Sequence, residues 1–247
     1  MNVYILTDME GVSLVTEWEQ VQQGHPFYPK YQQVLTDEVN AAVEGALAAG
    51  AERIVINDGH GSKDYNLLWD RLNRKAEIER PDSATNILPS LQKDFAAMIL
   101  IGYHSMEGTP DAVLAHTQSH TNIRYYEVNG QRFGEIAQMS LIAGHFGVPV
   151  AYMSGDRAAV AEARSFLGDD LPATVVKWGH ANGKAVSLHP EASVYCPRTV
   201  SGDDLLQERG IGRPEGEKSG CAADRRFYRL QNRIIRERYF VLMPFLS

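Results

Sequence analysis

The stretch VYILTDMEG, residues 3–11, begins with four apolar side chains and ends with two acids, Asp8 and Glu10. A short apolar run bounded by polar residues is typical of a buried strand. The pattern returns at residues 53–60, 97–104 and 148–156, where an apolar run is again followed at once by Asp, His or Gly. These four runs predict strands that each carry polar groups at their carboxyl ends.

Helical patterns separate these runs. Apolar side chains recur at helical spacing in residues 31–49, 135–146 and 157–167, and Asn129-Gly130 is a strong hairpin signal between two short alternating runs. Strands that alternate with helices predict an α/β fold built on βαβ units. We therefore expect a mainly parallel open sheet with flanking helices and a ligand site at the strand carboxyl ends.

Composition narrows the class of protein. The chain has 247 residues, of which 44% are hydrophobic and 22% charged, values that exclude a collagenous, coiled-coil or disordered chain. A net charge of −7 argues against a nucleic-acid partner. The longest apolar run, residues 95–101, is too short to cross a membrane, and the start has no basic segment typical of a signal peptide. With only two cysteines, we expect a cytoplasmic protein without a disulfide framework.

Charge divides the chain into two parts. Residues 196–247 hold ten of the 24 Lys and Arg but only seven of the 31 Asp and Glu, and they also hold both cysteines. We therefore expect a metal-binding α/β hydrolytic domain over residues 1–195 and an atypical, incomplete or irregular basic tail over residues 196–247. A frameshifted terminus and a genuine divergent assembly arm both account for this tail. In either case we expect it to be less ordered than residues 1–195 and to supply no metal ligand.

The polar groups at the strand ends predict a metal site. Asp8 and Glu10 are two residues apart, and two carboxylates so close repel each other unless a cation neutralises them. His60 and His104 follow two other strands and add imidazole nitrogen to the carboxylate oxygen. This mixture of ligands fits a catalytic metal site with open positions, including one with two metal ions.

Two further acids at strand ends, Asp58 and Asp156, have a simpler explanation. Aspartate is a preferred cap for the first turn of a following helix. Capping explains Asp156 better than metal binding does, and it explains Asp58 about as well. It does not explain two histidines together with the Asp8 and Glu10 pair.

Longer strings around these residues resemble a known family. TDMEGV (residues 7–12), NDGHGS (57–62), GYHS (102–105), AHTQSH (115–120) and NGQRFGE (129–135) occur in this order. Each string is weak alone, but together they resemble the zinc-dependent D-aminopeptidases of the DppA type over about residues 1–195. From about Cys196 onward the sequence departs from that family.

The resemblance implies a site, residue by residue. The family's metal ligands match Asp8, which would bridge two zinc ions, and four further residues: Glu10, His60, His104 and Glu135. The family's catalytic histidine matches His116. The segment that follows His104 is one residue longer than the resemblance predicts, so His120 is an alternative.

The resemblance also implies an activity. We expect a metallo-aminopeptidase with two Zn²⁺ per chain that hydrolyses short peptides or amides with an N-terminal D-amino acid, and that assembles into a ring-like homo-oligomer. Two alternatives stay open from the residues alone. One is another two-metal amidase or phosphoesterase, and the other is an inactive metal-containing binding or assembly protein.

Overall fold

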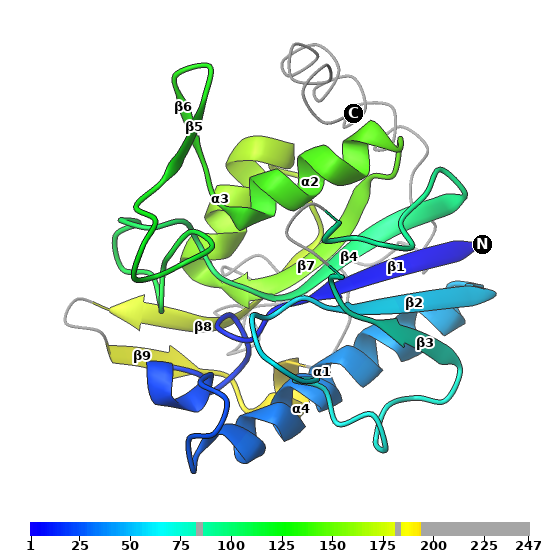
Figure 1. The fold of residues 1–247 in the computed structure, drawn as a ribbon, viewed down its shortest axis with the longest axis horizontal. Coiled ribbons are helices and arrows are strands. Elements are labelled where there is room, and N and C mark those ends of the chain that lie inside the picture. Colours follow the sequence, from blue (N-terminus) through cyan, green and yellow to red (C-terminus); the bar gives the residue numbers. More distant parts are fainter. Residues whose placement is uncertain (83–85, 181–183, 194–247) are drawn as a thin grey trace, which may run out of the picture.

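The protein folds around one seven-stranded sheet in the order β3-β2-β1-β4-β7-β8-β9 (Figure 1). The computed structural model describes residues 1–82, 86–180 and 184–193. The strands are β1 (Asn2–Thr7), β2 (Arg53–Asp58), β3 (Ala76–Glu79), β4 (Phe95–Tyr103), β7 (Val150–Asp156), β8 (Ala173–His180) and β9 (Lys184–Ser187). Every pairing in this sheet is parallel except that of β9 with β8, so the predicted fold class is confirmed.

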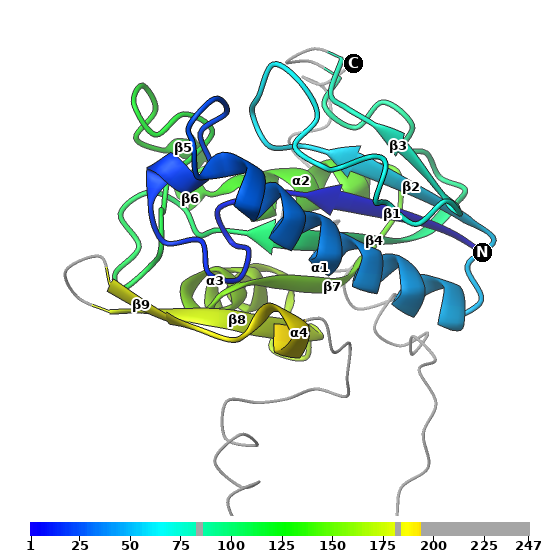
Figure 2. The same cartoon turned by 90° about the horizontal axis from the view of Figure 1, so that it is seen from below.

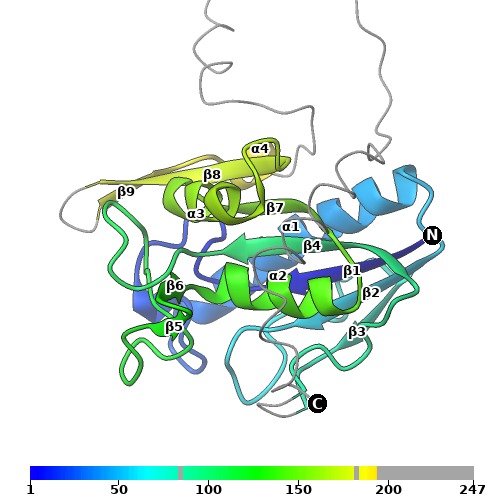
Figure 3. The same cartoon turned by 90° about the horizontal axis from the view of Figure 1, so that it is seen from above.

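Helices cover both faces of the sheet. Helix α1 (Tyr28–Ala48) lies on one face (Figure 2), whereas α2 (Glu135–His145) and α3 (Arg157–Leu167) lie on the other (Figure 3). The buried apolar side chains form two clusters, one on each face. The chain also forms a short 3-10 helix, η1 (Trp18–Gln20), and a single turn of helix, α4 (Pro190–Ser193).

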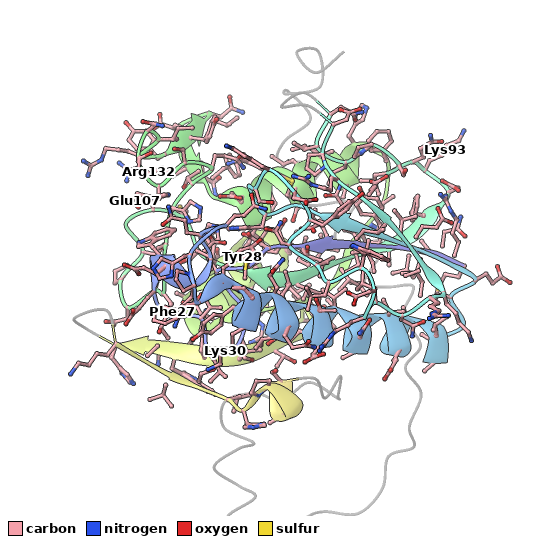
Figure 4. All side chains as sticks on the ribbon, turned by 60° about the horizontal axis from the view of Figure 1, so that its bottom comes forward. Phe27, Tyr28, Lys30, Lys93, Glu107 and Arg132 are labelled. Carbon is pink, nitrogen blue, oxygen red and sulfur yellow. The ribbon has the colours of Figure 1, made fainter. Side chains whose placement is uncertain are left out.

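The order of the strands makes a topological switch point between β1 and β4. The chain leaves the carboxyl end of β1 toward β2 and the carboxyl end of β4 toward β7, in opposite directions along the sheet. Open α/β sheets bind ligands at such a point. The hairpin of β5 (Tyr126–Val128) and β6 (Gln131–Phe133) projects from this end. Figure 4 shows Glu107 and Arg132 at this end of the molecule and Lys93, which precedes β4, at the other.

Two glycines allow the ends of β1 and β4 to approach each other. Gly102 has a φ of +74°, and a Cβ there would collide with the carbonyl oxygen of Asp8. A Cβ on Gly11 would collide with the carbonyl oxygen of Tyr103. The backbone N–H of Gly11 also donates to the carbonyl of Gly102 at 2.7 Å, so the two strand ends are joined directly.

The predicted elements agree with the structure within a few residues, but five elements, among them the short helices η1 and α4, were not predicted. Helix α3 spans the predicted residues, and α1 begins three residues earlier than the spacing predicts. The short edge strands β3 and β9 and the longer β8 were not predicted. The tail predicted over residues 196–247 lies outside the described residues. Within the described part of the chain, no helix is both long and apolar enough to span a membrane.

Candidate metal centre

Asp8 lies at the centre of the polar cluster at the end of β1. Its side chain is buried, and its two carboxylate oxygens face different histidines. Oδ1 lies 3.1 Å from Nδ1 of His60, and Oδ2 lies 3.2 Å from Nε2 of His104. The backbone N–H of Met9 donates to Oδ1 at 2.8 Å and fixes the carboxylate in this position. Asp8 thus connects two groups of potential ligands.

Each histidine also contacts a second carboxylate. Nδ1 of His60 lies 3.0 Å from Oε2 of Glu10, and Nε2 of His104 lies 3.4 Å from Oε1 of Glu135. We call Glu10 with His60 the β1–β2 half of the centre, and His104 with Glu135 the β4–α2 half; Asp8 belongs to both. All five side chains predicted as metal ligands therefore lie together.

Hydrogen bonds to the backbone orient the histidine rings. In three rings, one nitrogen lies within hydrogen-bond distance of a backbone carbonyl and the other faces the carboxylates. The carbonyl contacts are His60 Nε2 to Val21 (3.0 Å), His104 Nδ1 to Ser105 (2.9 Å) and His116 Nδ1 to Leu114 (3.0 Å). In the neutral ring the proton then sits on the carbonyl side, and the nitrogen lone pair points at carboxylate oxygens.

This arrangement places hydrogen-bond acceptors against one another. Oδ2 of Asp8, Oε2 of Glu10 and Nε2 of His104 are buried and have no hydrogen-bond partner among the described residues. Buried polar atoms are almost always paired, so these three require either protons or a cation. Two sets of ligand atoms lie within 4.8 Å of one another and could hold a metal ion: Asp8, Glu10 and His104, and His104, His116 and Glu135.

The pKa values of the cluster also indicate a site for protons or a cation. Burial raises the pKa of the Asp8 carboxyl, but contacts with His104 and His60 outweigh burial and hold it well below its usual range. Burial lowers the pKa of both imidazoles, but neighbouring carboxylates outweigh it and raise each pKa well above the usual value. For His60 these carboxylates are Glu10 and Asp8. For His104 they are Asp8 and Glu135. A cation bound here would replace those imidazole protons, as metal ligands require.

His116 joins this centre, whereas His120 does not. The ring of His116 stacks on that of His104 with centroids 3.9 Å apart, and its Nε2 lies 3.7 Å from Oε1 of Glu135. His120 is exposed and stacks on Trp18 at 4.3 Å. Of the two histidines considered for catalysis, only His116 therefore lies beside the clustered carboxylates.

The two other acids at strand ends have supporting roles. Asp156 caps α3, because its side chain accepts from the backbone N–H of Ala159, which confirms the simpler explanation for this residue. Asp58 does not cap a helix. Its carboxylate accepts from the backbone N–H groups of Asn66 and Leu67 and from the Asn66 side chain, and it thereby shapes the loop that carries His60.

Three residues around the centre were not predicted from the sequence. Trp18 contacts the rings of His116 and His120. Lys177 is fully buried, and burial lowers its pKa to about 8 although nearby carboxylates act in the opposite direction. Glu162 is also buried, and burial raises the pKa of its carboxyl to about 7. A lysine within the apolar run of residues 173–180 is the one signal that could have drawn attention to its site.

Comparisons with known proteins place this architecture in a family. The D-aminopeptidase of Bacillus subtilis (strain 168) is 28% identical over 176 residues, which are 71% of this chain and 63% of the length of that relative. The solved structure of the zinc-dependent D-aminopeptidase DppA from Bacillus subtilis, described as a self-compartmentalizing protease, superposes with a TM-score of 0.73 at 27% identity. That match covers 78% of this chain and 70% of the other. The family model for the M55 peptidases, described as D-aminopeptidase, matches residues 1–196, and the chain belongs to this family.

Proposed function

We propose that this protein is a zinc-dependent aminopeptidase that hydrolyses short peptides or amides with an N-terminal D-amino acid. The observation that carries the proposal is the position of Asp8, with one carboxylate oxygen toward each of two histidines and a further carboxylate beside each ring. We assign the activity to residues 1–195, which contain every residue given a role. The preference for a D-residue is supported by the names of the relatives alone.

The ligand set fits two zinc ions that share Asp8. Glu10 and His60 would complete one position, and His104 and Glu135 the other, because carboxylate oxygen and imidazole nitrogen are ordinary zinc ligands. The unpaired buried atoms of Asp8, Glu10 and His104 are the positions at which a cation is needed most. Bound zinc would supply an activated water near neutral pH and polarise the scissile carbonyl.

His116 is the residue we assign to proton transfer. Its Nδ1 is held by the carbonyl of Leu114, so its Nε2 is directed toward the centre. Imidazole exchanges protons near neutral pH, and a proton held at Nε2 can be donated to the leaving amine or to the oxygen that gains negative charge. Nε2 of His116 lies 3.7 Å from Oε1 of Glu135, so the ring is beside the centre but makes no short contact with this carboxylate.

The carboxylates also suit an amino-terminal substrate. A free α-ammonium group at the scissile residue can pair with a carboxylate of the cluster, which a blocked or internal residue cannot do. The protein would then release one residue at a time from short peptides in the cytoplasm, without a nucleic-acid or membrane partner. The self-compartmentalizing relative supports a homo-oligomer. The ring-like form of that assembly rests on the family resemblance of the sequence.

The proposal is tested with purified protein and three substrates. D-alanyl and L-alanyl p-nitroanilide and p-nitrophenyl phosphate are compared before and after chelation and zinc replacement, and metal content is measured on the same samples. We expect about two zinc ions per chain and hydrolysis of the D-alanyl amide above the L-alanyl amide, lost on chelation and restored by zinc.

The other outcomes separate the alternatives. Hydrolysis of the phosphate ester alone would replace the proposal with a two-metal phosphoesterase. Equal cleavage of both amides would retain the amidase and remove the stereochemical preference. Bound metal without hydrolysis of any of the three would indicate a binding or assembly protein.

A further inference from the structure

Lys177 is a buried ammonium group whose partners are all backbone carbonyls. It lies on β8 and is fully buried. Its Nζ donates to the carbonyl oxygens of Val12 at 2.9 Å and Val15 at 2.6 Å, and also to that of Glu10. An ammonium group has three donors, so this one is fully satisfied. A charge buried in this way is costly unless it is paired, and these three bonds therefore fix both the lysine and its acceptors.

The three carbonyls belong to one loop, residues 10–15, which follows β1 directly. Two strands, β4 and β7, separate β1 from β8 in the sheet, so this loop must cross the ends of both strands to reach Lys177. The loop has no ladder of its own to satisfy its carbonyls. The ammonium group of Lys177 donates to these carbonyls instead of a neighbouring strand. One of the acceptors is the carbonyl of Glu10, a residue of the β1–β2 half.

Other groups hold the same loop at different points. The buried carboxylate of Glu38 on α1 accepts from the backbone N–H of Ser13 at 2.9 Å. The hydroxyl of Ser187 accepts from the backbone N–H of Leu14 at 2.8 Å. Neither bond involves Glu10. Gly11 in the same loop also donates its backbone N–H to the carbonyl of Gly102 on β4. The loop is thus anchored by four elements, and among the described residues only Lys177 donates to the carbonyl of Glu10.

We propose that Lys177 is a positioning residue for the metal centre. It holds the carbonyl of the Glu10–Gly11 peptide, whose N–H donates to Gly102, and so completes the anchoring of that peptide and keeps Oε2 of Glu10 at 3.0 Å from Nδ1 of His60. This inference rests on the proposed function, because it assigns Lys177 to the zinc position formed by Glu10 and His60. A residue that only stabilised the fold would affect unfolding but not the affinity of the folded protein for metal.

The experiment measures the affinity of the folded protein for each metal ion. Lys177→Met keeps the length of the side chain and removes its donors, whereas Lys177→Gln retains two donors and serves if the first variant does not fold. Ser187→Ala is the matched control, since it frees the same loop at Leu14. Circular dichroism establishes folding, and competition with a chromogenic chelator gives the affinity for each zinc ion. The visible spectrum of the Co²⁺-loaded protein gives the ligand geometry.

We expect both Lys177 variants to bind one ion about 10- to 100-fold more weakly, as substitutions behind metal ligands do, and to leave the other ion unchanged. Their Co²⁺ spectra should change, while Ser187→Ala should match the wild type in both measurements. A folded Lys177 variant with wild-type affinity for both ions would overturn the inference, whatever its melting temperature. A wild-type protein that binds no zinc would instead overturn the proposed function.

Discussion

The two halves of the centre differ in how they are built and in how far they reach toward solvent. In the β1–β2 half, both residues follow strands that pair along their whole length, and the side chains of Glu10 and His60 are 4% and 10% exposed. In the β4–α2 half, His104 follows β4 directly, but Glu135 lies at the start of α2, far along the chain, and the Glu135 side chain is 16% exposed. The first half is fixed by the sheet, and the second depends on the intervening loop.

Aromatic rings extend the β4–α2 half to the surface. The buried ring of His104 stacks on His116, which contacts the edge of Trp18, which in turn stacks on the exposed His120. Among the described residues, no comparable series of rings leads outward from the β1–β2 half. If the proposed function holds, the β1–β2 half would hold metal in a closed setting, and the β4–α2 half would face the side from which substrate enters. The predictions below test that division.

The largest effect is expected from the residue that both halves share. Asp8→Ala should lose nearly all activity and bind neither zinc ion at wild-type affinity, because it removes one ligand atom from each position. Metal analysis after dialysis and assay on D-alanyl p-nitroanilide measure both effects. Asp37→Ala, at an exposed site on α1, is the control. Full metal content in Asp8→Ala would remove the bridging role and with it the link between the halves.

The next prediction compares His116 and His120, the two histidines in the series of rings that leads outward from His104. His116→Ala should keep both zinc ions and lose about 10²- to 10⁴-fold in kcat, the usual contribution of a general acid or base. His120→Ala should change kcat far less, because its ring contacts Trp18 and lies apart from the carboxylates. Steady-state kinetics and metal content distinguish the two. If His116→Ala instead loses an ion, His116 is a ligand of the β4–α2 half, as its place beside His104 and Glu135 permits.

A third prediction concerns Glu162, which lies behind the β4–α2 half. Oε2 of Glu162 accepts from the backbone N–H of Met106 at 2.7 Å, while Oε1 is buried, has no hydrogen-bond partner and would collide with a Cβ on Gly134. Burial is the main cause that raises its pKa to about 7, from an ordinary value near 4.5. The folded protein therefore binds a proton more tightly than the unfolded chain, and Glu162 makes the folded state less stable as pH rises from about 4.5 to 7.

Glu162→Gln removes that dependence. The free energy of unfolding of the variant minus that of the wild type should increase from pH 5 to pH 8. The increase should be up to about 3 kcal/mol, at 1.36 kcal/mol per pKa unit. Chemical denaturation at both pH values, with chelator present, measures the change without the added charge of a metal ion. His104 lowers the pKa of Glu162, so the difference between the two proteins reports Glu162 together with its interaction with His104. An equal difference in stability at both pH values would show that Glu162 is ionised throughout.

The fold was largely predictable because apolar periodicity determines it. Helix α3 and the hairpin turn at Asn129-Gly130 lie where their patterns place them. Strand β3 escaped prediction because only four residues, AEIE, form it and two of them are glutamates. Strand β8 carries Lys177 in its apolar run, and the carbonyls that accept hydrogen bonds from this lysine lie more than 160 residues away in the chain. Sequence patterns contain no information about such partners.

The membership of the centre was also predictable, but its internal arrangement was not. Polar residues at the ends of adjacent parallel strands must converge, which is why Asp8, His60 and His104 lie together. The direction of each ring depends on a carbonyl such as that of Val21 or Leu114, which lies in an irregular loop. Trp18 gave no signal in the sequence, because a single tryptophan in a polar stretch has no periodicity.

The smallest effect is expected at Trp18, whose ring contacts both His116 and the exposed His120. Trp18→Ala should keep both zinc ions and lower kcat/KM about 2- to 10-fold, because an aromatic pair contributes about 0.5 to 1.5 kcal/mol beyond its buried area. Trp18→Phe should retain most of the activity, and Trp69→Ala, at a tryptophan that is 72% exposed, controls for loss of an indole elsewhere. Kinetics on D-alanyl p-nitroanilide, with metal content, give the result. A loss beyond 100-fold, or loss of an ion, would mean that the β4–α2 half is closed by Trp18 and is as enclosed as the β1–β2 half.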